Sequence, residues 1–417
     1  MRKSNEMNVQ PATILKSDKR WRFRLISACA IFALGIGVAS RFAKTAHGQE
    51  AMAKGGNYLV YVGTYTAKGS SPTGSKGIYA YRFDTKSGEI QPLGLVGESE
   101  QPSFLAVDPA QRFLFAVNET DKYEGEASGG VSAFLMDRSS GKLTFLNEIA
   151  SRGSAPAHIA VDRTGKYVAV SNYDGGNLAV FPIGADGKLG EATAFDQHHG
   201  SSVNKDRQSS PHVHEAIFSP DNRFIVSADL GMDDIFAYPF DAKNGTVGTP
   251  RIVSLTGGIG PRHMAFSPDG KFVYLVSEMG STVTVLPYDP ATGNLAARQT
   301  VRLAPAGDTP RQKAGAEIAV GPSGKFVYAS NRFDNLIDVY AINPDTGMIE
   351  QTESVPLEGK TPRDFAIDPG GTWLWDANQD SDNIVLYGID QAKGSLMPSG
   401  ITLKIAAPTC VVFVPVP

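Results

Sequence analysis

The chain has 417 residues, of which 41% are hydrophobic and 20% are charged. This composition is ordinary for a globular protein and excludes an intrinsically disordered chain. The formal net charge of −4 provides none of the basic excess that a general nucleic-acid binder needs.

The first 48 residues differ in kind from the rest of the chain. A basic stretch over residues 2–24 is followed by a 16-residue apolar run over residues 25–40 and then by small residues. This order is typical of a secretory signal peptide. An uncleaved membrane anchor is the alternative, although sixteen residues is short for a bilayer span. We expect an exported protein, periplasmic or extracellular, in which residues 1–48 form a signal peptide or an N-terminal anchor and linker.

Removal of residues 1–48 would change the charge of the protein. They contain nine Lys or Arg and two Asp or Glu, so the remaining chain would carry a formal charge of −11. Such an acidic chain is not expected to bind nucleic acid or a membrane surface. Of the two cysteines, Cys29 would leave with this segment and Cys410 would remain alone, so that no internal disulfide is possible.

A strand-turn-strand pattern recurs through the rest of the chain. Its clearest copy runs from Gly260 to Glu278, where the sequence SPDG at residues 267–270 has the chemistry of a tight turn between two β-rich runs. A second turn signal, mostly of the form Asp/Asn-x-x-x-Gly, ends on seven glycines about 51 residues apart, at positions 88, 141, 187, 245, 293, 347 and 394. Four short strands in a repeat of this length indicate a β-propeller blade.

The two ends of the repeating region each contain part of a blade. Residues 58–64 resemble a second strand with no first strand before it, and residues 407–414 resemble a first strand with no second. We therefore predict that the C-terminal strand completes the N-terminal blade, which closes the ring and removes its sheet edges. The expected fold class is all-β, a seven-bladed β-propeller over residues 57–417. We expect a monomer, because a closed ring does not require a partner.

Polar side chains are expected to gather at one face of this ring. Antiparallel pairing places the start of each first strand beside the end of the second strand, on the face opposite the turns. The candidates for catalysis or binding on that face are His212, His214, Arg262, His263, Glu278, Glu317, Arg332 and Arg363. Because hydrophobic strands do not need these charges, we predict a polar pocket of mixed charge at the channel.

These residue types are suited to opening a lactone ring. Arg262 or Arg332 provides positive charge where an oxyanion develops, or clamps a carboxylate or phosphate. His214 is a candidate general base, and so is Glu278 if burial raises its pKa. The reverse type of reaction, addition of a carboxylate to a double bond, needs the same clamp and a proton donor.

Other interpretations remain open for several of these residues. Glu317 and Arg363 are as well explained by pairing across neighbouring blades as by substrate binding. His198 and His199 lie in a long polar insertion and are interpreted as loop surface. Together with the histidines at 212 and 214 they lack the spacing of a metal site, so neither a metal nor a cofactor is expected.

Several short stretches match a known family in order along nearly all of residues 57–414. They are Tyr61 to Thr66, Ser171 to Tyr173, His198 to Asn204, Pro211 to His214, Gly260 to His263, Gly315 to Ile318, Ser330 to Arg332 and Ala377 to Asn383. Through these stretches the chain resembles the lactonase family of seven-bladed propellers, which contains the propeller-type 6-phosphogluconolactonase and the fungal 3-carboxy-cis,cis-muconate lactonising enzyme. The resemblance implies a catalytic set of His214, Arg262, Glu278 and Arg332.

Three functions follow as expectations. The first is hydrolysis of a sugar-type lactone in the central channel, in the manner of 6-phosphogluconolactonase, with His212, His263, Glu317 and Arg363 binding the substrate. The second is a cycloisomerase or lactonising reaction on a muconate-like carboxylate, and the third is a propeller that binds without catalysis. Export weakens the hypothesis of a strict 6-phosphogluconolactonase, since 6-phosphogluconate chemistry is cytosolic. It leaves other sugar lactones open as substrates.

Overall fold

The computed structural model describes residues 56–303 and 314–416. The segment with the features of a signal peptide, residues 1–48, lies outside these ranges. The described residues form strands, turns and loops, and they contain no helix long and apolar enough to cross a membrane.

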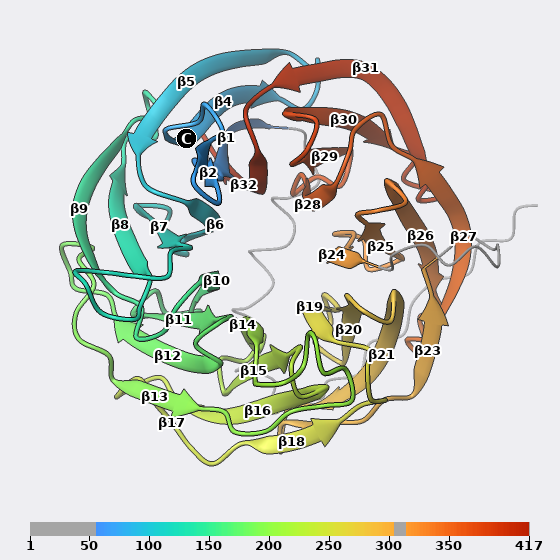
Figure 1. Ribbon diagram of the computed structural model, residues 1–417. Coiled ribbons are helices and arrows are strands. Elements are labelled where there is room, and N and C mark those ends of the chain that lie inside the picture. Colours follow the sequence, from blue (N-terminus) through green and yellow to red (C-terminus); the bar gives the residue numbers. More distant parts are fainter. Residues whose placement is uncertain (1–55, 304–313, 417) are drawn as a thin grey trace, which may run out of the picture. The chain divides into compact units, whose positions relative to one another are not determined.

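The strands form seven sheets arranged as blades around a central axis, so the prediction of a seven-bladed β-propeller is confirmed (Figure 1). Five blades have four strands, and in the other two the outer strand is divided, which gives five. A separate two-stranded hairpin is formed by β2 (Ala67–Lys68) and β3 (Ser71–Pro72).

The strands of the first four blades are ordered from the centre outward. Blade 1 contains β32 (Pro408–Pro415), β1 (Asn57–Thr64), β4 (Gly77–Asp84) and β5 (Ile90–Glu98). Blade 2 contains β6 (Pro102–Val107), β7 (Phe113–Asn118), β8 (Gly130–Met136) and β9 (Leu143–Ala150). Blade 3 contains β10 (Pro156–Val161), β11 (Tyr167–Asn172), β12 (Asn177–Pro182) and β13 (Ala194–Gln197). Blade 4 contains β14 (Val213–Phe218), β15 (Phe224–Asp229), β16 (Asp234–Asp241), β17 (Thr246–Val247) and β18 (Arg251–Ser254).

The last three blades follow the same order. Blade 5 contains β19 (Pro261–Phe266), β20 (Phe272–Ser277), β21 (Thr282–Asp289), β22 (Asn294–Leu295) and β23 (Gln299–Arg302). Blade 6 contains β24 (Gly315–Val320), β25 (Phe326–Asn331), β26 (Leu336–Ile342) and β27 (Ile349–Pro356). Blade 7 contains β28 (Pro362–Ile367), β29 (Trp373–Asn378), β30 (Asn383–Ile389) and β31 (Leu396–Lys404).

The ring is closed by the two ends of the repeating region. Strand β32 pairs antiparallel with β1, with Tyr58 opposite Pro415, as the incomplete repeats predicted. The neighbouring blade packs on this closure through Trp375, which is fully buried and lies 5.2 Å from Phe83 between ring centroids. The antiparallel ladder between β32 and β1 therefore completes blade 1, and the buried aromatic cluster packs this blade against blade 7.

The hydrophobic core lies between blades rather than in one place. Each buried cluster joins strands of two neighbouring blades, as where Tyr167 and Val180 of blade 3 pack with Phe218 and Tyr238 of blade 4. Since every sheet buries both of its faces in this way, the second strands are almost continuously apolar. This core leaves only the inner strands β32, β6, β10, β14, β19, β24 and β28 facing the channel (Figure 1).

Every inner strand has a β-bulge at its entrance. In blade 5, Pro261 is opposite Ser277 and His263 is opposite Val276, which leaves Arg262 as an extra residue. Equivalent shifts in the other blades leave extra residues at Ser103, Ala157, His214, Arg363 and Thr409, and the two residues Ala316 and Glu317 in blade 6. A bulge interrupts the alternation of a strand and re-aims its side chains. Seven bulges thus bring pairs of successive residues to the channel.

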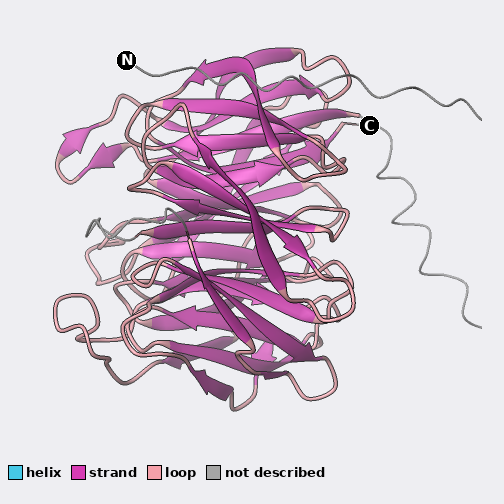
Figure 2. Cartoon of the chain, turned by 90° about the vertical axis from the view of Figure 1, so that its right-hand side faces the viewer, coloured by secondary structure: helices cyan, strands magenta, loops and turns pink. Residues whose placement is uncertain are grey.

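The end of each second strand is fixed against the start of the first strand. In blade 5 the amide of Glu278 donates to the carbonyl of Gly260 at 2.7 Å. The same hydrogen bond is made in all seven blades, by the amides of Tyr65, Glu119, Tyr173, Leu230, Glu278, Arg332 and Gln379. The turns lie at the opposite ends of these strands, so the predicted polarity of the two faces is confirmed. Figure 2 shows the strands running across the ring, with the loops on its two faces.

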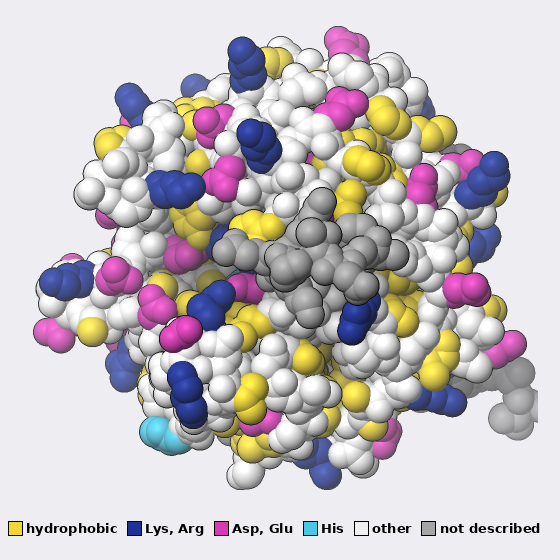
Figure 3. Space-filling model, turned by 45° about the vertical axis from the view of Figure 1, so that its right-hand side comes forward, with side chains coloured by type: hydrophobic (Ala, Val, Ile, Leu, Met, Phe, Trp, Pro, Cys, Tyr) yellow, Lys and Arg dark blue, Asp and Glu magenta, His cyan; other side chains and the backbone are white. Residues whose placement is uncertain are grey.

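The surface carries charges of both signs. Figure 3 shows Lys and Arg side chains interspersed with Asp and Glu side chains over the visible face. One cysteine, Cys410, is in the described ranges, where it is buried and not in a disulfide.

Candidate active site

Two layers of polar side chains fill the channel at this face. The mouth layer consists of the extra residues His214, Arg262 and Arg363 with the residues that follow the second strands, above all Tyr65, Glu119, Tyr173, Glu278 and Arg332. The inner layer consists of the residues one step further along the inner strands, His158, Glu215, His263 and Asp364, together with Glu317. Because all these side chains come from rigid strand ends, the site is preformed by the fold.

Glu278 is the centre of a cluster of guanidinium groups in the mouth layer. Its Oε2 atom lies 2.7 Å from Arg332 Nη2 and 3.4 Å from Arg262 Nε. Its Oε1 atom accepts a hydrogen bond of 2.8 Å from Arg207, which comes from the loop after β13. Burial raises the pKa of Glu278, but Arg332, Arg262 and Arg207 together lower it to about 2. The carboxylate is therefore ionised at neutral pH and holds the cations in place.

Arg262 is among the most deeply buried charged side chains in the described ranges. It is 1% exposed, and its Nη1 donates to the carbonyl of Ala316 at 2.5 Å. Burial, with Arg332 and Arg363 nearby, lowers its pKa to about 9, so it still carries its proton at neutral pH. A buried cation with an incomplete set of acceptors is suited to an anion or a developing oxyanion.

His214 lies next to these cations as a neutral base. Burial, followed by the charge of Arg262 and the proximity of His263, holds its pKa well below 6.5. Its Nδ1 is buried and has no hydrogen-bond partner among the described residues. Its ring lies 5.4 Å from that of Tyr173 and 5.0 Å from that of His263, between centroids. A neutral imidazole with an unpartnered nitrogen is a group that can take a proton from water.

A second arginine group lies across the channel mouth. The Arg363 guanidinium lies 5.0 Å from the ring centroid of Tyr65, and its Nη2 is 3.7 Å from Glu119 Oε2. The hydroxyl of Tyr65 donates to Glu119 Oε1 at 2.8 Å. The mouth therefore holds four guanidinium groups, from Arg207, Arg262, Arg332 and Arg363, against the two carboxylates of Glu119 and Glu278. This excess of positive charge favours a bound anion.

The inner layer is a connected set of buried acids and histidines. His263 Nδ1 lies 2.6 Å from Glu317 Oε2, and Glu317 is in turn hydrogen-bonded to Asp364. Burial raises the pKa of Glu317 to about 7, and burial with the neighbouring Glu317 raises that of Asp364 well above its usual value. On the other side of His263, His158 Nε2 lies 3.4 Å from Glu215 Oε1. The carboxyl groups of Glu317 and Asp364, which are hydrogen-bonded to each other away from water, retain a proton at neutral pH.

The structure brings together seven of the eight candidates named from the sequence. His214, Arg262, Glu278, Arg332 and Arg363 lie in the mouth layer, and His263 and Glu317 lie in the inner layer. His212 lies at the edge, where its ring stacks on Tyr173 at 4.5 Å and its Nδ1 is 3.8 Å from Asp174.

The hypothesis that burial raises the pKa of Glu278 and makes it a base is wrong, because three arginines lower that pKa. Glu317 pairs with His263 of neighbouring blade 5, whereas Arg363 pairs with Glu119 of blade 2, which is not next to blade 7.

In the surrounding loop, one interpretation from the sequence is wrong and one residue of the site was missed. His198 is not loop surface: it is buried and stacks on Phe236 at 3.9 Å, and its Nδ1 and Nε2 lie 2.7 Å from Asp229 and from Tyr238, respectively. Arg207, which is not among the candidates from the sequence, reaches from the same insertion to Glu278. Its only sequence signal is a charge in a long polar loop.

In three blades the residue equivalent to Glu278 follows a buried polar residue at the end of the second strand. Tyr173, Leu230 and Gln379 follow Asn172, Asp229 and Asn378, respectively. Tyr65 and Tyr173 are not among the candidates from the sequence, although alignment of the repeats with Glu278 identifies both. Asn172 and Asn378 are buried and donate hydrogen bonds to nearby loop and strand groups, so their roles are structural.

The polar clusters of the described ranges do not form a metal site. No group of three or more His, Cys, Asp or Glu in these ranges is arranged to hold a metal ion.

Comparison with known proteins agrees with this geometry. Residues 59–413 match the family model described as lactonase, 7-bladed beta-propeller. The chain is 35% identical to a 6-phosphogluconolactonase of Bacillus subtilis over 85% of this chain and 98% of that protein, and 35% identical to a 6-phosphogluconolactonase of Formosa agariphila over 81% and 94%. It is 32% identical to the solved structure of the Pseudomonas aeruginosa periplasmic gluconolactonase PpgL, with a TM-score of 0.80 over 87% of this chain and all of that one. These relatives do not favour a lactonising or purely binding role. The chain belongs to the seven-bladed β-propeller lactonase family and is a lactone hydrolase.

Proposed function

We propose that the protein hydrolyses a sugar lactone at the mouth layer, with Arg262 and Arg332 at the lactone carbonyl and His214 as the general base. The observation that carries this proposal is the position of neutral, buried His214 beside guanidinium groups that Glu278 holds in place. The names of the relatives, which are 6-phosphogluconolactonases and a gluconolactonase, support a sugar lactone as the substrate.

The reaction is written from the residues present. His214 takes a proton from water while the water oxygen bonds to the carbonyl carbon, and the carbonyl oxygen becomes an oxyanion near Arg262 and Arg332. Collapse of this intermediate breaks the bond between the carbonyl carbon and the ring oxygen. The ring oxygen leaves with the proton from His214 as a hydroxyl group, so that lactone and water give a hydroxy acid. His263, Glu317, Arg363 and His212 orient the substrate and the base.

The test is hydrolysis of a lactone panel that includes glucono-δ-lactone and its 6-phosphate. We expect turnover well above the spontaneous rate, and a fall of at least about 100-fold in kcat for Arg262→Ala, because the oxyanion loses a buried charge. Arg251→Ala is the matched control, since Arg251 is an exposed arginine on the outer strand β18. Rates that match spontaneous hydrolysis for wild type and variant alike would refute the proposal.

We also propose that the protein is exported and acts as a monomer. The support for export is the basic, apolar and small-residue order of residues 1–48, and one similar structure is named as a periplasmic protein. Cell fractionation with N-terminal sequencing of the exported material tests it. A mature N-terminus beyond residue 40 supports cleavage, whereas retention of residue 1 in the membrane fraction supports an anchor.

A further inference from the structure

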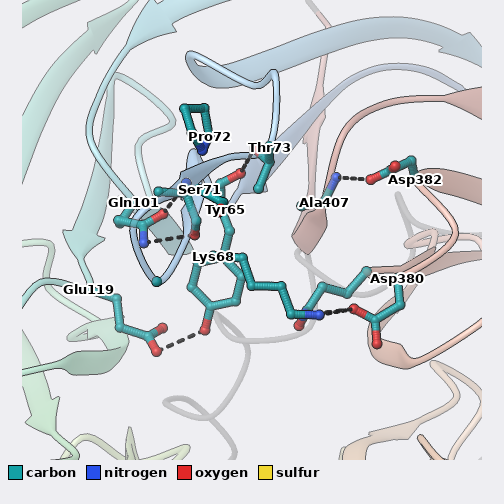
Figure 4. A pocket seen from close by; sticks show the side chains of 13 residues that line it. Tyr65, Lys68, Ser71, Pro72, Thr73, Gln101, Glu119, Asp380, Asp382 and Ala407 are labelled. Carbon is teal, nitrogen blue, oxygen red and sulfur yellow. Dashed lines mark hydrogen bonds and ion pairs between the residues drawn. The ribbon is translucent and has the colours of Figure 1, made fainter.

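A cavity of about 520 Å³ opens beside the channel mouth, between blades 1, 2 and 7 (Figure 4). It is lined by the loop that carries β2 and β3, by residues that follow β7 and β29, and by Ala407 before β32. Its volume is in the range of small-molecule sites. Tyr65 and Glu119 belong both to this cavity and to the mouth layer, so the cavity borders the candidate active site.

The wall formed by the β2–β3 hairpin is held by a network around Gln101. Gln101 Oε1 accepts hydrogen bonds from the amides of Thr66 at 2.8 Å and Ala67 at 3.1 Å, and its Nε2 donates to the carbonyl of Ala67. Thr73 closes the loop by donating its hydroxyl to the carbonyl of Tyr65 at 2.6 Å. A wall fixed in this way binds a ligand with little loss of conformational freedom.

The charge of the cavity is opposite in sign to that of the channel mouth. Besides Glu119, which it shares with the mouth layer and which Arg363 faces at 3.7 Å, its charged side chains are the carboxylates of Asp380 and Asp382 and the single ammonium of Lys68. Lys68 Nζ lies 3.1 Å from Asp380 Oδ1 (Figure 4), so this cation is already paired. Hydrogen bonding to Thr361 and the charge of Lys68 outweigh burial and lower the pKa of Asp380, which is therefore anionic. The mouth layer, in contrast, has more guanidinium groups than carboxylates.

We propose that this cavity is the subsite for the uncharged, hydroxylated part of the substrate, and that the preferred lactone is an unphosphorylated sugar lactone. This rests on the proposed function, which places the carbonyl group at Arg262. Sugar hydroxyls donate strong hydrogen bonds to carboxylates. A phosphate group in the same place would lie against the carboxylates of Asp380 and Asp382, with one cation that is already paired, and like charges in contact reduce affinity.

Arg363, Tyr65 and Glu119 lie at the border between the proposed positions of the two ends of the substrate. Arg363 lies over the ring of Tyr65, and the Tyr65 hydroxyl donates to Glu119 at the border of the cavity. Burial raises the pKa of Tyr65, so this hydroxyl stays protonated and available as a donor or acceptor. A sugar lactone that spans this border would have its carbonyl in a positive region and its hydroxyls in a negative one.

Binding of gluconate and of 6-phosphogluconate, measured by titration calorimetry, tests the subsite without any hydrolysis. Both ligands carry a carboxylate for the arginines of the mouth and differ only in the phosphate. We expect wild type to bind gluconate at least about tenfold more tightly than 6-phosphogluconate. Asp380→Asn removes the charge but keeps the shape, and we expect it to weaken gluconate binding about tenfold and to narrow the difference in affinity between the two ligands. Asp269→Asn is the matched control: Asp269 forms a comparable exposed ion pair, 3.0 Å from Lys271, in a turn on the opposite face.

A second variant, Lys68→Met, separates a hydroxyl subsite from a phosphate subsite. If Lys68 holds a phosphate, this variant weakens binding of 6-phosphogluconate more than that of gluconate, and the proposal is wrong. Equal or tighter binding of 6-phosphogluconate to wild type, or the same change in gluconate affinity for Asp380→Asn and Asp269→Asn, overturns it as well. Gluconate binding that depends on Asp380 in a protein without lactone turnover would keep the subsite and refute only the proposed hydrolysis.

Discussion

Arg332 Nη2 lies 2.7 Å from Glu278 Oε2, and this contact determines what Glu278 can do in the reaction. With Arg262 on the same side and Arg207 on the other oxygen, the pKa of Glu278 is lowered to about 2 despite burial. A carboxylate that remains ionised across the working pH range is a poor general base and cannot act as a general acid. Its contribution is to keep three guanidinium groups in one place.

The first prediction concerns removal of that negative charge. In Glu278→Gln the three guanidinium groups repel one another with no anion between them, and we expect kcat to fall about 100-fold or more. The measurement is steady-state hydrolysis of the best lactone of the panel. Glu350→Gln, at an exposed position of β27, is the control and should be unchanged. A kcat of Glu278→Gln equal to that of wild type would show that the arginines do not need this carboxylate to act in the reaction.

The same substitution has a consequence for acid stability. The pKa of Glu278 is lower in the folded protein than its ordinary value of 4.5, so the unfolded state binds more protons as the pH falls. The stabilisation is complete above pH 4.5 and is lost as the pH falls toward 2, by up to about 3 kcal/mol. Denaturant unfolding at several pH values should show a weaker acid destabilisation in Glu278→Gln than in wild type. Identical pH dependences would contradict the lowered pKa.

Arg207 gives a prediction that differs from that for the other arginines. Its side chain is 46% exposed and contacts Tyr173 and Glu278 from a loop, while Arg262 and Arg332 come from strand ends. We expect Arg207→Ala to raise KM about tenfold and to lower kcat much less, because the oxyanion keeps its two inner cations. Lys205→Ala, in the same loop, is the matched control. A loss in kcat as large as that for Arg262→Ala would place Arg207 at the reacting carbonyl.

The fold could be predicted from the sequence because its signals are local and repeated. The turn at residues 267–270 and the glycines after the third strands mark the ends of strands, and Pro408–Pro415 completes a blade that lacks its inner strand. At Gly293 the φ angle of +73°, with a side-chain carbon excluded by Phe224, explains why glycine recurs at that turn. Seven such signals fix the number of blades without any information about long-range contacts.

The site could be predicted only in part, for physical reasons that differ between residues. Arg262 and His263 could be recognised because two successive polar residues at a strand entrance contradict a buried strand, yet the bulge that lets both face the channel has no sequence signal of its own. Arg207 is placed by the conformation of a long insertion, which depends on packing of His198 against Phe236. The raised pKa of Glu317 is caused by burial inside the closed ring, which no local sequence pattern reveals.

Glu317 and Asp364 predict how stability changes with pH. The pKa of Glu317 is raised from 4.5 to about 7 in the folded protein, so the folded state binds more protons than the unfolded state between these values. Stability therefore falls as the pH rises from 4.5 to 7, and Glu317→Gln should remove part of this fall, on the order of 2 kcal/mol. The measurement is the free energy of unfolding in denaturant at intervals across that range. The control Glu350→Gln should follow wild type, and a steeper fall in Glu317→Gln would contradict a shared buried proton.

The last prediction concerns His214 and the pH dependence of hydrolysis. Burial, Arg262, His263 and Arg363 lower its pKa well below 6.5, and a general base must be neutral to act. We therefore expect kcat/KM to be constant from pH 8 down through 6.5 and to fall only at lower pH, where His214 takes up a proton. Because Arg363 contributes to the lowering, Arg363→Met should move this acid limb to higher pH, whatever its effect on the maximal rate. Arg251→Met is the control and should leave the limb in place. An acid limb at or above pH 6.5 in wild type, or one that Arg363→Met does not move, would mean that His214 is not the base.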